Sequence, residues 1–276
     1  MNRIKKYFGE INMKWIYVII FAVIAAVYTA AVNIIPVFEG TSFRDIAVYP
    51  DCWILFAVFI IVNCKKVWEA SLKCFVFFLI SQPLIYLIEA FFLPVGWNVF
   101  GYYKYWFIIT LLTLPGAAIA FLVKKKNWLS ILVLSVANGY LAYAASDYIA
   151  AMSTDFPSHL LSSIFCIALI FFFVFVLFDK KSHKTAAICI AAVIFIVSFI
   201  FANTGKTTEL YFEESNWTYN IENNDIVSVN ISDGNRVVMK AKHNGGTYVY
   251  FTDSNGNKKT YYVTVSGGGV WADLIE

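Results

Sequence analysis

The chain has 276 residues, of which 60% are hydrophobic, 18% are aromatic and only 14% are charged, and its net charge is +3. A typical globular domain carries about 25% charged residues. The composition therefore excludes a wholly soluble globular protein and indicates a chain that is built largely for a membrane.

The apolar residues fall into blocks of about 20, long enough to cross a hydrocarbon core of about 30 Å at about 1.5 Å per residue. The first block exceeds the roughly 7 to 15 apolar residues of a signal peptide, so we expect a permanent anchor. The second block contains Pro50-Asp51 and predicts a short or kinked span. Seven transmembrane helices are predicted, at residues 15–35, 46–64, 74–93, 105–123, 128–150, 160–178 and 185–202.

The basic residues predict the orientation of the chain, because Lys and Arg in short loops stay on the cytoplasmic side. The loops on one side hold only Arg44 and Lys104. The other side holds Arg3, Lys5, Lys6, Lys14, Lys65, Lys66, Lys73, Lys124, Lys125, Lys126, Lys180, Lys181 and Lys184. This asymmetry predicts a plasma-membrane protein with its N-terminus in the cytoplasm and its C-terminal domain outside, provided that the second block crosses.

The sequence carries no recognisable cofactor or metal motif. It has no HExxH, GxSxG, phosphate-binding glycine loop or dinucleotide fingerprint. The three histidines fall in different predicted compartments, and the five cysteines, which show no disulfide or CxxC pattern, are Cys52, Cys64, Cys74, Cys166 and Cys189. We therefore expect no cofactor and no metal, and an enzyme is the least favoured class.

Polar side chains inside the predicted spans are candidates for function, because placing them in a bilayer is costly. In the third span, Gln82, Tyr86 and Glu89 stand at i, i+4 and i+7 and share one helical face, with Pro83 predicting a kink. Glu89 lies close to the outer end of this helix. Its carboxylate therefore either lines a pocket or reaches the membrane interface, and the sequence leaves both open.

Two further polar groups, Asn138 and Asp147, lie in the fifth span. Asn138 belongs to a face of small residues, which also suits helix packing. Asp51, Glu89 and Asp147 all fall near the predicted outer ends of their spans. If those ends converge, they form an acidic vestibule for a cation or an amine, with Gln82 and Asn138 deeper inside. These five residues are the predicted ligand-binding site.

From about residue 204 the apolar blocks stop and short alternating runs begin, separated by turn residues such as Asp233-Gly234-Asn235. This pattern predicts a small antiparallel β sandwich with strands at 209–212, 217–221, 226–231, 236–242, 247–252 and 259–265. From residue 204 to residue 276, six basic residues stand against nine acidic ones, which excludes a basic surface for nucleic acid. The aromatic residues are enough to fill a small core and to leave a few for a binding face: Trp217, Tyr219, Tyr248, Tyr250, Tyr261 and Tyr262.

The last ten residues, 267–276, follow this run of strands. Glycine loses the most conformational freedom on ordering, so Gly267-Gly268-Gly269 predicts a flexible hinge. The segment after it, which includes Trp271 and Leu274, is expected to be a short amphipathic tip.

The run from Asn230 to Gly256, which closes on Tyr261-Tyr262-Val263-Thr264-Val265, resembles the C-terminal half of a bacterial immunoglobulin-like domain of the BIG type. The resemblance rests on the rhythm of strands and turns, and the first strands depart from it. Such domains are surface modules for adhesion, spacing or ligand presentation. The resemblance therefore implies an exposed location and no chemistry.

The expected fold is a mainly α membrane bundle followed by a small all-β domain. The predicted divisions are a basic segment at 1–14, a transmembrane domain at 15–203, an extracytoplasmic β domain at 204–266 and a flexible tail at 267–276. The favoured function is display of the β domain, in a lipid bilayer, to a protein or an envelope polymer outside the cell. A transporter for a small solute or an ion is the alternative, and an intramembrane enzyme is the third possibility.

Overall fold

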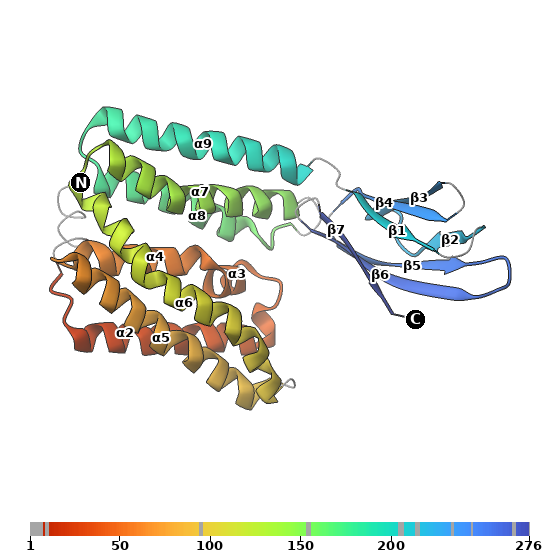
Figure 1. Ribbon diagram of the computed structural model, residues 1–276, viewed down its shortest axis with the longest axis horizontal. Helices are drawn as coiled ribbons and strands as arrows, with labels where there is room; N and C mark the ends of the chain where they lie inside the picture. The colour runs from red at the N-terminus through yellow and green to blue at the C-terminus, as the bar shows by residue number, and fades with distance from the viewer. Residues whose placement is uncertain are drawn as a thin grey trace. The chain divides into compact units, whose positions relative to one another are not determined.

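The computed structural model describes residues 8, 11–93, 96–152, 156–203, 207–212, 216–232, 235–243, 245–266 and 269–275. The predicted Asp233-Gly234 turn, most of the basic N-terminal segment and two glycines of the predicted hinge lie outside these residues. The chain divides into two compact units, residues 1–144 with 161–194, and residues 145–160 with 195–276. The first unit is helical, and the second contains the β domain (Figure 1).

The membrane bundle is confirmed. Among the described residues, six helices can cross a membrane by length and composition, and the bent pair α3–α4 supplies a seventh if it counts as one span. The helices are α2 (Trp15–Ile34), α3 (Ser42–Val48), α4 (Pro50–Asn63), α5 (Val67–Phe92), α6 (Phe100–Ala120), α7 (Trp128–Ala151), α8 (Leu160–Leu177) and α9 (Lys181–Asn203). Large apolar side chains point away from the protein, among them Ile24, Leu112 and Val136, as expected where the surrounding medium is lipid.

The helix α5 begins seven residues before the predicted start at residue 74. Its first turn is fixed by Glu69, whose carboxylate accepts hydrogen bonds from the backbone N–H groups of Lys65 and Lys66. Lys73, one turn further on, forms an ion pair with Glu69 at 2.5 Å. These polar contacts extend the helix beyond its apolar block, which a hydropathy pattern does not reveal.

The break between α3 and α4 confirms the predicted kink at Pro50, and the two helices meet at 48°. Proline lacks a backbone N–H and cannot continue the hydrogen bonding of the preceding helix. The carbonyl of Ala47 lies in the last turn of α3, where carbonyls lack an intrahelical partner, and it accepts hydrogen bonds from Trp53 Nε1 at 3.0 Å and Thr29 Oγ1 at 3.3 Å. Side chains from α4 and α2 therefore replace the missing backbone partner inside the bundle.

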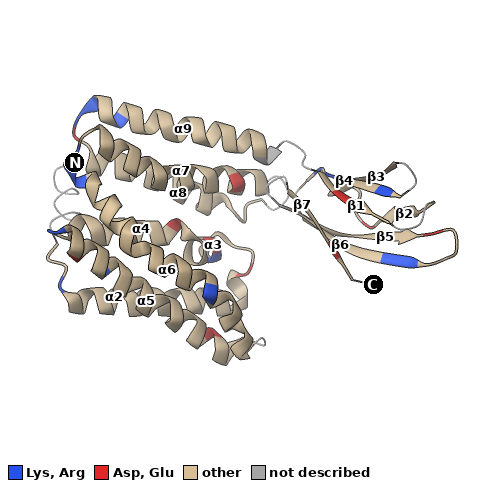
Figure 2. Cartoon of the chain, viewed as in Figure 1, with Lys and Arg blue, Asp and Glu red and all other residues tan. Residues whose placement is uncertain are grey.

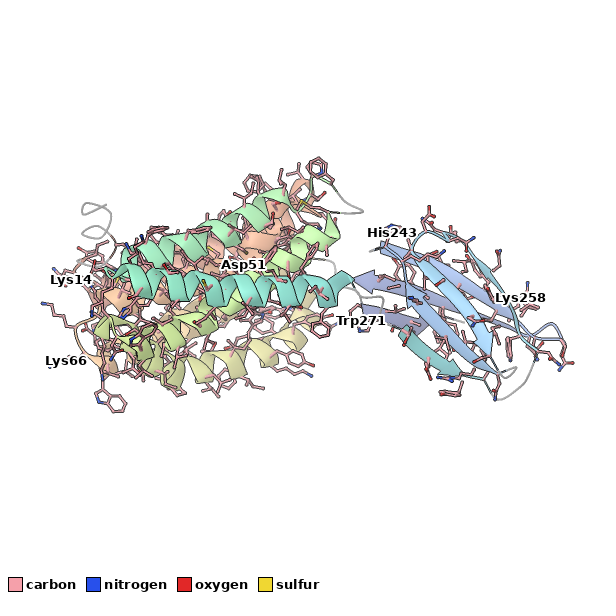
Figure 3. All side chains as sticks on the ribbon, turned by 90° about the horizontal axis from the view of Figure 1, so that it is seen from above. Lys14, Asp51, Lys66, His243, Lys258 and Trp271 are labelled. Carbon is pink, nitrogen blue, oxygen red and sulfur yellow. The ribbon has the colours of Figure 1, made fainter. Side chains whose placement is uncertain are left out.

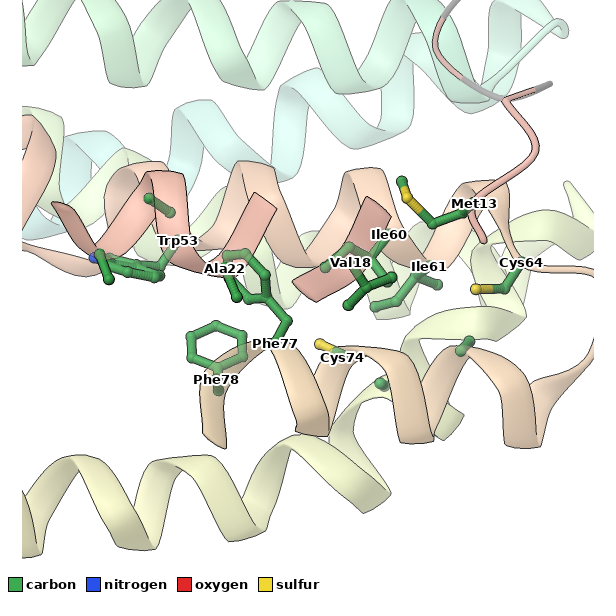
Figure 4. Close-up of a cluster of buried hydrophobic side chains, with 14 of the residues drawn as sticks. Met13, Val18, Ala22, Trp53, Ile60, Ile61, Cys64, Cys74, Phe77 and Phe78 are labelled. Atoms are coloured by element: carbon green, nitrogen blue, oxygen red, sulfur yellow. The ribbon is translucent and has the colours of Figure 1, made fainter. Parts of the chain in front are cut away.

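The core of the bundle lies between α2, α4 and α5. Ala22, Ala26 and Ala30 are fully buried at four-residue spacing along α2, which lets the neighbouring helix approach closely. Phe77 fills the space opposite them, and its ring lies 5.9 Å from that of Trp53. Figure 4 shows Ala22, Trp53 and Phe77 within this cluster of buried side chains.

Lysines gather at one end of the bundle, the end at which α2, α5 and α9 begin (Figure 2). Figure 3 labels Lys14 and Lys66 there. At the same end, Lys124 Nζ donates hydrogen bonds to the carbonyl oxygens of Val62 and Cys64. A cation at this position also stabilises the negative end of the α4 dipole.

The β domain consists of two antiparallel sheets. The strand order is β1-β4-β3 in one sheet and β2-β5-β6-β7 in the other. The bounds are β1 (Thr207–Tyr211), β2 (Thr218–Ile221), β3 (Val227–Ser232), β4 (Arg236–Ala241), β5 (Gly245–Thr252), β6 (Lys258–Ser266) and β7 (Gly269–Leu274). All six predicted strands are present, with ends shifted by one or two residues.

The seventh strand corrects the prediction of a flexible tail. Gly269–Leu274 pairs with β6, with Val270 opposite Val265 and Trp271 opposite Thr264. Val270 is buried in the core that also contains Phe251 and Val263. The free edge of β6 offers backbone hydrogen bonds to this segment, and the gain offsets the entropic cost of ordering its glycine.

Candidate functional site

A cavity of about 450 Å³ lies in the helical unit, and we call it the Glu89 cavity. Helices α2 to α6 supply its walls. Its lining consists of Thr29, Asn33, Arg44, Val48, Trp53, Gln82, Ile85, Tyr86, Glu89, Leu93, Val99, Tyr102, Tyr105 and Trp106. This volume is typical of a site for a small molecule, as is a mainly aromatic and apolar wall with a few polar groups.

Three polar side chains that line this cavity are joined by hydrogen bonds. Asn33 Nδ2 of α2 donates a hydrogen bond of 2.7 Å to Glu89 Oε1 of α5. Arg44 Nε of α3 donates a hydrogen bond of 2.9 Å to Asn33 Oδ1. Arg44 also forms an ion pair with Glu39 at 3.7 Å, where both side chains are partly or largely exposed.

The order of these groups fixes the orientation of the Asn33 amide. The guanidinium of Arg44 can only donate, so the amide oxygen of Asn33 must face it. The amide NH₂ then faces Glu89, whose oxygen accepts. The carboxylate of Glu89 is 4% exposed, and its hydrogen-bonding partner is a neutral amide rather than a cation.

Gln82 lies two helical turns before Glu89 on the same face of α5 and is 2% exposed. Its Nε2 makes no hydrogen bond within the part of the chain that the structure describes. A buried donor without a partner costs about 1–3 kcal/mol. Because Gln82 lines the Glu89 cavity, a bound molecule is well placed to supply the missing acceptor.

Aromatic rings form much of the remaining wall. Trp53 and Trp106 approach each other with ring centroids 6.4 Å apart. Both residues also line a second, almost wholly apolar groove of about 670 Å³ between α4, α6 and α7. The two indoles therefore lie where a polar cavity borders an apolar surface.

Asp51 does not line the Glu89 cavity. It lies in the first turn of α4 and is fully buried, where a carboxylate favourably meets the positive end of the helix dipole. Its partner is the thiol of Cys166 in α8, which donates a hydrogen bond to it. Nearby, Ser162 donates to Asp45 at 2.9 Å. These contacts join α8 to the α3–α4 break.

Asn138 and Asp147 also lie outside the lining of the cavity. Asn138 is 1% exposed, and within the described residues neither its amide nitrogen nor its oxygen has a hydrogen-bonding partner. Asp147 belongs to the second unit, whereas the cavity is lined by residues of the first unit. Of the five predicted residues, the structure thus brings together Gln82 and Glu89.

Asn33 and Arg44 were not predicted as site residues from the sequence. Both carried a signal, since Asn33 is a strongly polar residue near the end of an apolar block. Arg44 is one of the two basic residues on its predicted side of the membrane. No group of three or more metal-ligating side chains occurs among residues that the structure describes.

The outer face of the four-stranded sheet in the β domain is rich in aromatic residues. Tyr248 and Tyr250 of β5, Tyr262 of β6 and Trp271 of β7 are all exposed there; Figure 3 labels Trp271. Tyr248 lies directly opposite Tyr262, with ring centroids 5.0 Å apart. By contrast, Trp217 and Tyr261 belong to the core.

Glycine leaves room for two of these rings. A Cβ on Gly246 would collide with the phenol of Tyr262, and a Cβ on Gly269 would collide with the indole of Trp271. Both rings therefore pack closely against a neighbouring glycine backbone. We call Tyr248, Tyr250, Tyr262 and Trp271 the aromatic face.

The fold and these two sites define a membrane helix bundle that carries an all-β domain. Comparison of the chain with protein-family models, curated proteins and solved structures finds no match. Its function must therefore be argued from its own residues.

Proposed function

We propose that this protein displays its β domain on the outside of the plasma membrane, where the aromatic face binds a polymer of the cell envelope. The observation that carries the proposal is the set of four large aromatic side chains that share one exposed sheet surface. Soluble surfaces rarely keep large apolar groups together unless they bind something. Tyr and Trp are also the residues that dominate binding energy at interfaces.

The geometry of the aromatic face favours a polysaccharide as the partner. Its four rings share one exposed sheet surface, and Tyr262 and Trp271 pack against glycine positions. Exposed tyrosine and tryptophan rings offer apolar faces on which sugar rings stack, while the phenol groups can donate hydrogen bonds to sugar oxygens. A protein partner is the competing outcome of the binding test below.

A bacterial immunoglobulin-like domain is the proposed identity of the β domain. Two antiparallel sheets enclose one core, to which Val229 and Met239 contribute from one sheet and Val249 and Val263 from the other. This arrangement agrees with the sandwich that the sequence resemblance implies. Such modules serve as extracytoplasmic binding or spacing units.

The proposed orientation places the lysine-rich end of the bundle in the cytoplasm, following the preference of basic loops for that side. Two single-cysteine variants test it in intact cells, after replacement of the native cysteines by serine or alanine. Ser254→Cys should react with a membrane-impermeant maleimide, whereas Lys125→Cys should react only after the membrane is permeabilised. The reverse pattern would contradict the orientation.

Binding is tested with the full-length protein in lipid nanodiscs, co-sedimented with purified cell-wall sacculi. We expect Tyr262→Ala and Trp271→Ala to weaken binding at least tenfold, because hot-spot aromatic residues contribute about 2 kcal/mol or more. Tyr211→Ala is the matched control, since Tyr211 is an exposed tyrosine on the other sheet. Equal binding by all four proteins would refute the proposal, and capture of a protein in place of sacculi would reassign the partner.

Solute binding or transport by the bundle is the second candidate function. The Glu89 cavity is the observation that favours it, because a buried carboxylate and a buried amide donor face the same space. Polar groups at membrane depth commonly mark solute pathways.

A further inference from the structure

We propose that the Glu89 cavity binds a small organic molecule that carries a primary ammonium group and, several bonds away, an oxygen that accepts a hydrogen bond. This inference is independent of the aromatic face and requires binding, not translocation. It rests on the charge, the hydrogen-bonding capacity and the dimensions of the cavity.

The buried carboxylate of Glu89 calls for a cation. Arg44 also lines the cavity, but it forms its ion pair with Glu39, which lies outside the lining. Asn33, which is neutral, separates Arg44 from Glu89. The carboxylate of Glu89 is thus held in place but is not paired with a cation within 4.0 Å among the described residues. A ligand ammonium group would supply that pair.

The walls suit an ammonium group as well. Cations are attracted to the faces of aromatic rings within about 6 Å, most strongly to tryptophan. Tyr86, Tyr102 and Trp106 line the same space as Glu89. The carboxylate supplies the charge, and the rings supply an aromatic surface beside it.

Gln82 sets the second requirement. Its buried Nε2 has no acceptor within the described ranges, so a ligand gains a hydrogen bond there by presenting a hydroxyl or carbonyl oxygen. Gln82 and Glu89 are seven residues apart on one helix, which separates their Cα atoms by roughly 10 Å along the axis. The two groups therefore select a ligand with its polar ends well apart.

The test uses the purified full-length protein and three amino alcohols of increasing length: ethanolamine, aminobutanol and aminohexanol. Thermal unfolding is measured with each amine and with the diol of matching length. We expect the amines to raise Tm because they bind only the folded state, with aminohexanol most effective and ethanolamine least. The diols should have little effect. The proposal is overturned if no amine raises Tm, or if the diols raise it equally.

Substitutions in the cavity test whether aminohexanol binds there. Glu89→Gln keeps the shape of the side chain and removes its charge, and it should weaken aminohexanol binding at least tenfold. Gln82→Met should weaken it less and should abolish the preference for longer amines. Asp179→Asn is the control, because Asp179 is a carboxylate of the same unit that pairs with Lys126 and does not line the cavity; its Tm shift with aminohexanol should equal that of the wild type.

A second measurement remains informative if Glu89→Gln fails to fold. Trp53 and Trp106 line the cavity, so binding of aminohexanol to the wild type should change tryptophan fluorescence in a saturable way. The double variant Trp53→Phe with Trp106→Phe should remove most of that change. A fluorescence change that is linear in amine concentration, or that persists in the double variant, would show that the amine acts on the micelle or elsewhere on the protein.

Discussion

Asn33 of the first transmembrane helix donates a hydrogen bond of 2.7 Å to Glu89, 56 residues further along the chain. This contact joins α2 to α5 at the end of the bundle opposite the lysines. It positions the carboxylate on which the proposed amine site depends.

Removing Asn33 should destabilise the bundle by about 1–3 kcal/mol, because Glu89 would remain buried without its donor. Asn33→Leu is the variant, and its Tm is compared with that of the wild type in one detergent. The double variant Asn33→Leu with Glu89→Leu should recover part of the loss, since replacing both partners leaves no unsatisfied group. A double variant less stable than Asn33→Leu would contradict this account.

Lys73 is 3% exposed, and its ammonium group donates to the carbonyl of Met13 and to Glu69. Lys73→Met should therefore lower the stability by about 1–3 kcal/mol, because it leaves the Met13 carbonyl without this donor and Glu69 without this cation. Lys66→Met is the matched control and should change it by less than about 0.5 kcal/mol, as is usual for an exposed position. Equal effects of the two variants on Tm would argue against a structural role for Lys73.

Trp53→Phe tests the break between α3 and α4. The variant keeps an aromatic ring in the core but removes the N–H that bonds to the Ala47 carbonyl. We expect a loss of about 1 kcal/mol, limited because Thr29 still donates to the same oxygen. Trp68→Phe, at an exposed site, should leave the thermal unfolding curve unchanged.

The β domain should lose stability in acid through Glu209. Arg236 donates hydrogen bonds to this carboxylate, as does Tyr211, and these bonds hold the pKa of Glu209 below its ordinary value. A carboxyl whose folded pKa is depressed stabilises the fold above its unfolded pKa and loses that effect as the pH falls through the folded pKa. The Tm difference between wild type and Glu209→Gln should therefore shrink below about pH 4. A difference that is constant from neutral to acid pH would refute this.

Gly246→Ala tests whether the shape of the aromatic face affects binding when the stability of the β domain is unchanged. The new methyl group meets the end of the Tyr262 side chain, which can swing away at small energetic cost. Binding to sacculi should fall severalfold, while Tm changes little. Thr260→Ala, on the same strand as Tyr262 and opposite Tyr250, is the control for a general effect of altering this surface.

The strands and transmembrane helices could be predicted from the sequence where a local pattern of residues specifies them. Blocks of about 20 apolar residues give α2, α7 and α8 nearly to the residue, and alternating runs between turn residues give β3 to β6. β7 was not readable. Its residues carry a weak local preference, and the strand forms because β6 offers a free edge and the core accepts Val270.

The candidate site was likewise predictable from the sequence in part. The sequence by itself determined that Asp51, Gln82, Glu89 and Asn138 would be polar groups within apolar helices, and it placed Gln82 and Glu89 on one face of α5. Only the tertiary structure decided that Glu89 meets Asn33 and faces a cavity, whereas Asp51 meets Cys166 in the packed interior. The physical reason is that helical periodicity fixes which side chains share a face of one helix. The order and rotation of the helices depend on packing between segments far apart in the chain.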